Sequence, residues 1–426
     1  LAFHVLGESV NQTNWAARNT SFVEEDFDAT LKGFDDRPLT VGVRNPRTGR
    51  VSPVVRRDFT ALLPLVRHKR NPEHVDVQRV LERDRDVHLT LDAGLQVMAA
   101  RALRRRAESV GSGGGAAVVL DASSGALLAS ASYPWPLDFG QGRSDDVEST
   151  EEEANVVSQR LLDRARYGLY PPGSTFKLVT AVAALRSDPA ERQSVFQCER
   201  LPDGRVGGRV RGVSHPIRDD ALDDAPHGTV DLHKALVVSC NPYFAQLAQR
   251  VGASAFEETA TAAQIAVATR PVRDNLPRTL PHAGYGQGDV VASPLRMAGV
   301  VAAIASNGEL RDVRVATKPN TRPSPDLRWV SAEGAARLRG YMREVVTAGT
   351  GRALAGHSVA IAGKTGTAQV DNAKSHAWFV GFAPHPRDRR QIAFAVVVEN
   401  AGYGGRVAAP LAGDIVSAAQ AAGLLR

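Results

Sequence analysis

A serine and a lysine three residues apart carry the clearest chemical signal in this chain. Ser174 and Lys177 lie in a Ser-Thr-Phe-Lys segment, between a Pro-Pro-Gly sequence and an apolar run from Leu178 to Leu185. Residues i and i+3 share one face of a helix, so a helix that starts at Ser174 would place the hydroxyl beside the amine. Burial and the positive end of the helix would lower the pKa of the lysine. We therefore predict a serine nucleophile with a lysine base. The alternative is a helix-capping serine and a solvated lysine.

A second segment holds a hydroxyl and an amide at a bend. Ser239 and Asn241 belong to a Ser-Cys-Asn-Pro segment between two apolar runs, at 232–238 and 243–251. This pattern predicts a tight corner between two helices. Taken alone, Asn241 could also be a helix cap ahead of Pro242.

A third segment combines a cation with hydroxyls and glycines in a strand. Lys364, Thr365, Gly366 and Thr367 lie within a strand-like pattern from Val359 to Val370. The glycines would allow a ligand backbone to approach closely, and the threonine hydroxyls could bind a carboxylate. Strict strand alternation puts Lys364 on the opposite face from both threonines, so their joint action would require a twist.

The three segments in this order resemble the motif set of the penicillin-recognising serine enzymes. The resemblance is closest to the class B penicillin-binding proteins, the monofunctional peptidoglycan DD-transpeptidases of bacteria, and it extends over about residues 86–426. Further segments match that family: Asp86–Asp92 with Leu95-Gln96, Gly115–Asp121, Ala131–Pro134, Gly286–Gly288, Ser293–Leu295 and His376–Phe382.

This resemblance implies an α+β fold with two parts. A transpeptidase domain at 86–426 would contain a five-stranded antiparallel sheet flanked by helices, with a mostly helical subdomain. A reduced N-terminal pedestal, non-catalytic and partner-docking, would occupy residues 1–85. The order of the elements favours the same layout, because strands come from both ends of the domain and helices from its middle.

Individual elements can be placed along the domain. We expect a basic-faced helix at 95–107, and a hairpin with strands at 116–121 and 126–132. A buried helix should begin at Ser293-Pro294 and end before Gly308. Strands at 377–383 and 392–398 should be followed by a closing helix at 411–425. The acidic segment 138–155 is expected to form a loop beside the cleft.

The family mechanism assigns roles to the matched residues. Ser174 would be acylated by the stem peptide, or by a β-lactam, with Lys177 as the base and Ser239 as the proton relay. Asn241 would bind the substrate amide and Lys177, while Lys364 would act through its charge. Thr365, Gly366 and Thr367 would bind the substrate, and the backbone N–H groups of Ser174 and Thr367 would form the oxyanion hole.

Three other functions stay open at this point. A DD-carboxypeptidase would use water as the acceptor, and the motifs do not separate it from a transpeptidase. A class A β-lactamase is disfavoured because no Glu-x-x-Leu-Asn segment is found. A non-catalytic penicillin sensor or scaffold would keep the fold without turnover, but all three motifs are intact.

The amino-acid composition bears on nucleic-acid binding, on disulfide bonds and on metal or cofactor sites. The formal charge is +6, from 52 basic against 46 acidic residues. The basic runs have no interleaved aromatic residues, so nucleic-acid binding is not indicated; contact with anionic headgroups or wall polymer is the hypothesis for them. With only Cys198 and Cys240, no disulfide framework or thiolate-rich zinc site is expected, although one bridge is possible. No histidine spacing indicates a metal, and no cofactor is predicted.

The sequence also bears on location and partners. No apolar run reaches the ~18 residues of a membrane span. The family resemblance implies an extracytoplasmic domain, periplasmic or at the cell surface, anchored through a segment absent from this chain. Its partners would be peptidoglycan stem peptides and the lipid II-derived glycan, β-lactams, and a membrane glycosyltransferase of the shape, elongation, division and sporulation type.

Overall fold

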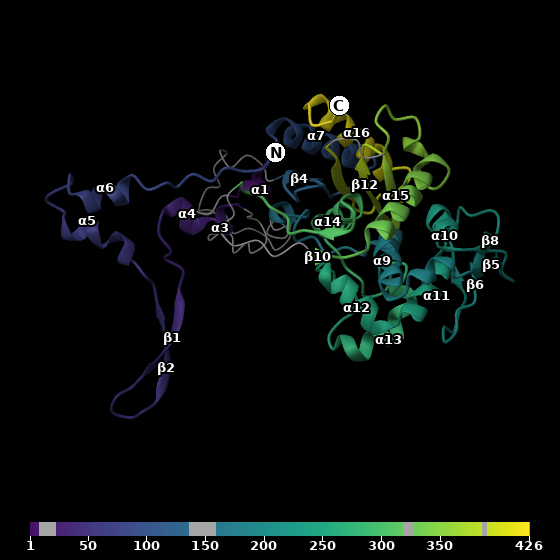
Figure 1. The fold of residues 1–426 in the computed structure, drawn as a ribbon, viewed down its shortest axis with the longest axis horizontal. Helices are drawn as coiled ribbons and strands as arrows, with labels where there is room; N and C mark the ends of the chain where they lie inside the picture. Colours follow the sequence, from purple (N-terminus) through teal and green to yellow (C-terminus); the bar gives the residue numbers. More distant parts are fainter. Residues whose placement is uncertain (8–22, 136–158, 318–326, 386–389, 426) are drawn as a thin grey trace.

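The computed structural model describes residues 1–7, 23–135, 159–317, 327–385 and 390–425 (Figure 1). Its centre is a five-stranded antiparallel sheet with the strand order β11-β12-β13-β3-β4. The strands are β3 (Gly115–Asp121), β4 (Leu127–Tyr133), β11 (Ala362–Val370), β12 (Ala373–Ala383) and β13 (Ile392–Val398). The predicted α+β class and five-stranded sheet are therefore confirmed.

The sheet is buried on both faces, which explains why its strands read as nearly continuous apolar runs. One face packs against α7 (Ala93–Ser109) and α16 (Ala408–Ala421), with Phe379 and Phe394 in their shared core. The other face packs against α14 (Pro294–Ala305) and joins the core of the helical subdomain through Val380 and Val397. This gives three layers, with the sheet in the middle.

The helical subdomain is contributed by the middle of the chain, as expected. It contains α9 (Lys177–Ser187), α10 (Leu232–Val238), α11 (Asn241–Val251), α12 (Ala253–Ala262) and α13 (Val272–Ala283), and α15 (Ala332–Thr347) runs between it and β11. The helix α9 is buried over most of its length, so the subdomain is built around it. The turn Gly173–Phe176, which leads into α9, contacts β11 of the main sheet.

A small four-stranded sheet lies beside α10 and α11 (Figure 1). Its strand order is β7-β6-β5-β8, and its members are β5 (Phe196–Arg200), β6 (Val206–Gly208), β7 (Ile217–Arg218) and β8 (Gly228–Val230). Strands of only two to five residues form few ladder hydrogen bonds. This sheet was not predicted, because segments that short have no readable periodicity. A two-stranded pair, β9 (Glu309–Leu310) with β10 (Leu327–Arg328), closes the end of α14.

The N-terminal part has little regular structure and a projecting hairpin. Its elements are α1 (Phe3–Leu6), α3 (Val23–Asp26), α4 (Asp28–Lys32), β1 (Leu39–Arg44), β2 (Val51–Arg56), α5 (Leu63–Arg67) and α6 (Val75–Leu81). The hairpin, α5 and α6 lie away from the main sheet (Figure 1). In contrast, α1 packs on β4, and the Gln96 side chain donates to the Leu1 carbonyl oxygen at 3.1 Å. The first residues therefore contact the part of the chain that contains the main sheet.

Most expected boundaries agree within a few residues. The basic-faced helix, the hairpin β3–β4 and the helix capped by Ser293 are confirmed. The closing helix was placed too late: α16 begins at Ala408 and ends at Ala421. The expected acidic loop at 138–155 lies outside the described residues. Among the helices that the structure describes, none combines the length and apolarity needed to cross a membrane.

Candidate active site

Ser174 lies in a short 3₁₀ turn, Gly173–Phe176, that leads directly into α9. The prediction that Ser174 starts the α-helix is therefore wrong by three residues, since α9 begins at Lys177. The cause is Gly173, whose φ of 53° is left-handed and whose N–H donates to the Gly286 carbonyl oxygen at 2.9 Å. This contact turns the chain before the helix and leaves Ser174 half-buried.

Glycines allow this turn to pack directly on β11. A β-carbon on Gly173 would lie 3.0 Å from the Thr367 carbonyl oxygen and 3.1 Å from the Ala368 Cα. From the other side, a β-carbon on Gly366 would lie 2.8 Å from the Thr175 methyl group. The first and third motifs are thus in backbone contact, although they lie far apart in the sequence.

The Lys177 amine is fully buried and directed at the second motif. Its Nζ donates to the Asn241 Oδ1 at 2.6 Å, to the Ser239 Oγ at 3.1 Å and to the Ser239 carbonyl oxygen. Burial lowers the pKa of Lys177 to about 8, although the negative charge of Asp219 opposes the shift. An amine with this pKa is neutral in an appreciable fraction of molecules near neutral pH, as a general base requires.

Lys364 approaches the same hydroxyl from the sheet. Its Nζ donates to the Ser239 Oγ at 2.8 Å and to the Thr365 carbonyl oxygen at 3.1 Å. Burial and the nearby charge of Lys177 lower the pKa of Lys364 well below its ordinary value. The Ser239 hydroxyl therefore joins two buried amines that disfavour each other's protonation.

The second motif forms the predicted corner between two helices. Helix α10 ends at Val238, Ser239 has a left-handed φ of 62°, and α11 begins at Asn241. The Asn241 backbone N–H donates to the Asp219 Oδ1 at 2.5 Å, and its side-chain Nδ2 donates to the Arg218 carbonyl oxygen at 2.9 Å. Cys240, which caps α11, makes no side-chain capping bond, so Asp219 supplies an acceptor at this helix start.

Lys364 and the two threonines lie on opposite faces of β11, so simple alternation holds. The Thr365 Oγ1 lies 2.6 Å from the Thr350 Oγ1, and the Gly404 N–H donates to the Thr367 Oγ1 at 3.3 Å. Thr365 is buried and Thr367 is half-buried. Lys364 contacts Ser239 although β11 has no twist that would bring the lysine and the threonines to the same face. The binding of a substrate carboxylate by the threonines stays a prediction.

The structure brings four of the five predicted catalytic side chains into one hydrogen-bonded group. Lys177, Ser239, Asn241 and Lys364 form it, and the turn that carries Ser174 packs on the adjacent strand. Within the described residues, the Ser174 side chain makes no hydrogen bond. Its hydroxyl is thus available to a substrate, while Lys177 is held by the second motif.

A cluster of four potential metal ligands lies behind Asn241. Cys198, Asp219, His227 and Cys240 each place one ligand atom within 4.8 Å of the others, and all but half-buried His227 are buried. Two thiolates, an imidazole and a carboxylate could together hold a Zn²⁺ ion in tetrahedral geometry. The four residues have no characteristic spacing in the sequence, so no motif indicates this cluster; only the fold brings them together.

Mutual hydrogen bonds link the members of this cluster. The Cys198 Sγ lies 3.1 Å from the Asp219 Oδ2 and 3.4 Å from the His227 Nδ1. Its contact with the Cys240 thiol, more than any other interaction, lowers the pKa of Cys198 to about 6. Burial opposes protonation of His227, but its hydrogen bonds to Asp219 and Cys198 raise its pKa to about 9. Burial raises the pKa of Cys240 well above its ordinary value.

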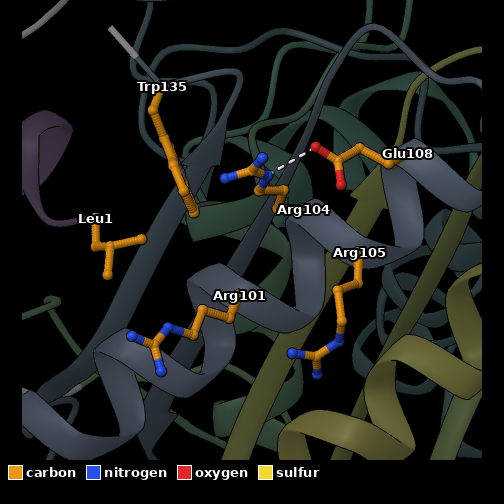
Figure 2. Close-up of a pocket in the computed structure, with 6 residues that line it drawn as sticks. All are labelled: Leu1, Arg101, Arg104, Arg105, Glu108 and Trp135. Carbon is orange, nitrogen blue, oxygen red and sulfur yellow. Dashed lines mark hydrogen bonds and ion pairs between the residues drawn. The ribbon is translucent and has the colours of Figure 1, made fainter. Parts of the chain in front are cut away.

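A separate pocket lies on the basic face of α7, and none of the three motifs contributes to it. Figure 2 shows this pocket of about 460 Å³. Its lining consists of Leu1, Arg101, Arg104, Arg105, Glu108 and Trp135. The Arg104 Nε forms an ion pair with the Glu108 Oε1 at 2.7 Å, and the Arg104 Cζ lies 5.3 Å from the Trp135 ring centroid. Part of the basic surface seen in the sequence is therefore paired within the chain.

Comparison with known proteins agrees with this geometry. Residues 115–417 match the family described as "Penicillin binding protein transpeptidase domain". The peptidoglycan D,D-transpeptidase MrdA of Acinetobacter baumannii is 31% identical over 383 residues, which cover 76% of this chain and 52% of MrdA. The peptidoglycan D,D-transpeptidase PbpA of Mycolicibacterium smegmatis is 32% identical over 347 residues, covering 72% of this chain and 67% of PbpA.

Solved structures give the same result. The ceftriaxone acyl-enzyme of penicillin-binding protein A from M. tuberculosis superposes with a TM-score of 0.64 at 25% identity, over 92% of this chain and 99% of that one. PBP2 of Pseudomonas aeruginosa superposes with a TM-score of 0.62 at 28% identity, over 78% of this chain and 75% of that one.

The fold and the motif geometry define a penicillin-recognising serine enzyme. This chain belongs to the penicillin-binding protein transpeptidase family, and its relatives are class B penicillin-binding proteins. It spans about half of the length of MrdA.

Proposed function

We propose that this chain is the catalytic part of a serine D-Ala-D-Ala transpeptidase that cross-links peptidoglycan stem peptides and is acylated by β-lactams. The observation that carries the proposal is the Ser239 hydroxyl, which lies 3.1 Å from the Lys177 amine and 2.8 Å from the Lys364 amine. This arrangement supplies a base and a proton relay beside the turn that presents Ser174.

The first step is acyl transfer to the enzyme. The Ser174 oxygen attacks the carbonyl carbon between the two terminal D-alanines, and neutral Lys177 takes the hydroxyl proton. The backbone N–H groups of Ser174 and Thr367 stabilise the tetrahedral oxyanion, a contribution worth ~3 kcal/mol per donor in other enzymes. The C–N bond then breaks, and the leaving amine of D-alanine receives a proton through Ser239.

Other residues bind the substrate and hold the machinery in place. Asn241 accepts from Lys177 and binds the substrate amide, while Lys364 orients the Ser239 hydroxyl. The donor peptide pairs along β11 at the edge of the sheet by main-chain hydrogen bonds. The peptide and its terminal carboxylate are bound by Thr365, Gly366 and Thr367. In the second step, the amine of another stem peptide attacks the carbonyl carbon of the acyl-enzyme. The ester bond to Ser174 breaks, the serine oxygen takes up the proton that the amine loses, and the new amide bond is the cross-link.

We further propose the cellular setting that the family resemblance implies. Residues 1–85 form a reduced pedestal for partner docking, and residues 86–426 form the transpeptidase domain. The domain works on the extracytoplasmic side of the plasma membrane, beside a membrane glycosyltransferase of the shape, elongation, division and sporulation type. Recovery of that glycosyltransferase with the full-length protein from membranes tests this assignment, and repeated failure to recover it would count against the partner.

Two measurements test the reaction itself. Fluorescent penicillin followed by peptide mass spectrometry should give a stable adduct on Ser174 that is absent in Ser174→Ala. A stem pentapeptide supplied with and without an amine acceptor should then give cross-linked product only when the acceptor is present. Release of D-alanine without transfer would indicate a carboxypeptidase, and rapid release of opened penicillin would indicate a β-lactamase.

A further inference from the structure

The pocket on the basic face of α7, called the α7 pocket below, has a rigid base. Helix α7 packs against β4 and α16, and Ala99 and Leu103 on its inner side are fully buried. Four exposed residues of its outer side line the pocket: Arg101, Arg104, Arg105 and Glu108. Residues three and four positions apart share one face of a helix, so the packed backbone determines where these four side chains begin.

Trp135 forms another wall of the α7 pocket. It follows β4 by two residues, is half-buried and packs edge-to-face on Tyr133, with ring centroids 6.3 Å apart. In the view of Figure 2 its ring lies between Leu1 and Arg104, and the Arg104 Cζ is 5.3 Å from the ring centroid. The indole N–H is buried and has no acceptor among the residues that the structure describes. The wall is therefore held in place, and it carries a donor whose partner is missing.

Two of the three arginines have no counter-charge in the described part of the chain. The Arg104 guanidinium is paired with the Glu108 carboxylate. Arg101 and Arg105, by contrast, form neither a hydrogen bond nor an ion pair with any described residue. They are four positions apart, a spacing at which like charges on a helix repel each other. Three arginines against one glutamate give the lining a net charge of +2.

The charge and the donors select the class of ligand. A guanidinium presents its N–H groups in a planar fork that fits the oxygens of carboxylates and phosphates. One carboxylate would neutralise only half of the net charge of +2 in the lining. A phosphate monoester carries a charge of about −1.5 to −2 at pH 7 and offers three acceptor oxygens. It therefore matches both the charge of the α7 pocket and its free donors.

The size of the α7 pocket indicates that the phosphate is part of a larger molecule. Its volume of about 460 Å³ lies in the range of small-molecule binding sites. Space therefore remains for the organic group that carries the phosphate. Leu1 and Trp135 give that group an apolar contact beside the arginines.

We propose that the α7 pocket binds a ligand with a dianionic phosphate group, either a soluble phosphate ester or the headgroup of a lipid. Arg101 and Arg105 contact the phosphate oxygens, and Trp135 contacts the attached organic group. The site is separate from the proposed reaction, because none of the three motifs contributes to it. In addition, α7 packs on β4, which lies at the opposite edge of the main sheet from β11.

Calorimetric titration of the whole chain with glycerol 3-phosphate, at constant ionic strength, tests the site. We expect a Kd below about 1 mM, and binding of acetate that is about tenfold weaker. Replacing both free arginines, Arg101→Gln with Arg105→Gln, should weaken phosphate binding about tenfold or more, because hydrogen bonds to a charged group are lost. The matched control is Arg273→Gln with Arg278→Gln on the exposed side of α13, which removes the same charge and should leave the Kd unchanged.

A variant with the opposite effect guards against damage to the fold. Glu108→Gln removes the negative charge of the lining and releases Arg104 from its ion pair. It should strengthen the binding of glycerol 3-phosphate about twofold or more, a change that misfolding would not produce.

Sedimentation with vesicles distinguishes the two sources of the phosphate. Phosphatidic acid, whose headgroup is a phosphate monoester, is mixed into phosphatidylcholine vesicles, and pure phosphatidylcholine vesicles are the control. Retention that is lost on replacing Arg101 and Arg105, but kept on replacing Arg273 and Arg278, assigns the α7 pocket to a lipid headgroup. Binding of glycerol 3-phosphate without such retention assigns it to a soluble ester.

Four results would overturn the site. They are a Kd for glycerol 3-phosphate above about 10 mM, equal binding of acetate, equal weakening in the two double variants, and unchanged or weaker binding in Glu108→Gln. Equal weakening would mean that the basic surface attracts anions without a specific pocket. None of these measurements uses acylation of Ser174, so a failure of the proposed function would leave their outcome intact.

Discussion

The Asn241 carboxamide oxygen lies 2.6 Å from the Lys177 amine, so the second motif holds the proposed base of the first. The same asparagine is tied by its backbone to Asp219 and by its side-chain nitrogen to the Arg218 carbonyl oxygen. An amide oxygen accepts a hydrogen bond from the amine without adding a charge. Because the amide carries no negative charge, it does not oppose the burial that lowers the pKa of Lys177 to about 8.

Replacing this amide by a carboxylate should shift the pH dependence of acylation. In Asn241→Asp, a negative charge would lie beside the Lys177 amine and raise its pKa by one unit or more. Because only the neutral amine is a base, acylation by fluorescent penicillin should fall about tenfold or more near pH 7 and recover at higher pH. The control Asn241→Ala adds no charge, so its acylation should be slower than that of the unaltered protein by a factor that stays the same at higher pH. An unshifted profile in Asn241→Asp would contradict the role of Lys177 as the base.

Acylation by the unaltered protein should itself increase with pH. Since the pKa of Lys177 is lowered to about 8, the neutral fraction rises through that pH and then reaches a plateau. A stopped-flow or gel-based rate between pH 6 and 10 would show this limb. Its absence would mean that another group, or a different proton route, activates Ser174.

Much of this architecture could be predicted from the sequence, because apolar runs and turn residues determine strands such as 392–398 and the corner at Ser239. The start of α9 was misplaced by three residues because Gly173 takes its conformation from Gly286, which is distant in the sequence. Local propensity contains no information about such a contact.

The cluster behind Asn241 was beyond sequence reasoning for a similar reason. Cys198 belongs to a five-residue strand, and His227 lies between short elements without a pattern. Only the packing of the small sheet on α11 brings them to Asp219. By contrast, the order of the three motifs was sufficient to predict that Lys177, Ser239 and Lys364 meet, because the resemblance supplied the fold.

Burial of the charged Lys177 amine should lower the free energy of unfolding. Replacing Lys177 should show how large this loss is. The unfolded chain keeps the lysine proton up to about pH 10.5, whereas the folded protein loses it near pH 8. Between these values the unfolded state binds more protons, so folding stability rises with pH. Below pH 8 the amine is charged in both states, so the full free-energy cost of burying the charge applies. For a pKa lowered from 10.5 to about 8, this cost is about 3 kcal/mol.

Lys177→Met should therefore abolish acylation while changing the pH dependence of stability. Relative to this variant, the unaltered protein should gain stability between pH 8 and 10.5, as measured by urea unfolding. Parallel curves for the two proteins over this range would contradict a lowered pKa of Lys177.

The two threonines of β11 should differ in their contributions. Thr367 is half-buried, and within the described part of the chain its hydroxyl accepts one long bond, at 3.3 Å from the Gly404 N–H. Thr365 is buried, and its Oγ1 lies 2.6 Å from the Thr350 Oγ1. Thr367→Val should therefore slow acylation by a carboxylate-bearing substrate about tenfold, with little change in melting temperature, since a lost hydrogen bond to a charged group is worth ~1.5–3 kcal/mol. Thr365→Val should mainly lower the melting temperature. Reversal of this order would show that the inner threonine binds the carboxylate.

The close packing of Gly173 on β11 can be tested by glycine-to-alanine substitutions, each of which adds one methyl group. In Gly173→Ala the new carbon would meet the Thr367 carbonyl oxygen at 3.0 Å, and the left-handed φ of 53° is unfavourable for alanine. The turn must shift, so acylation of Ser174 should fall by at least tenfold, because small misplacements of a nucleophile cost about a hundredfold in rate. Gly299→Ala is the matched control: it lies inside α14, and apart from the neighbouring backbone of the helix no atom of the described residues lies within 4 Å of the added carbon. It should stabilise the helix by up to ~1 kcal/mol and leave acylation unchanged. Equal acylation rates in the two variants would show that the contact between the Ser174 turn and β11 does not position the nucleophile.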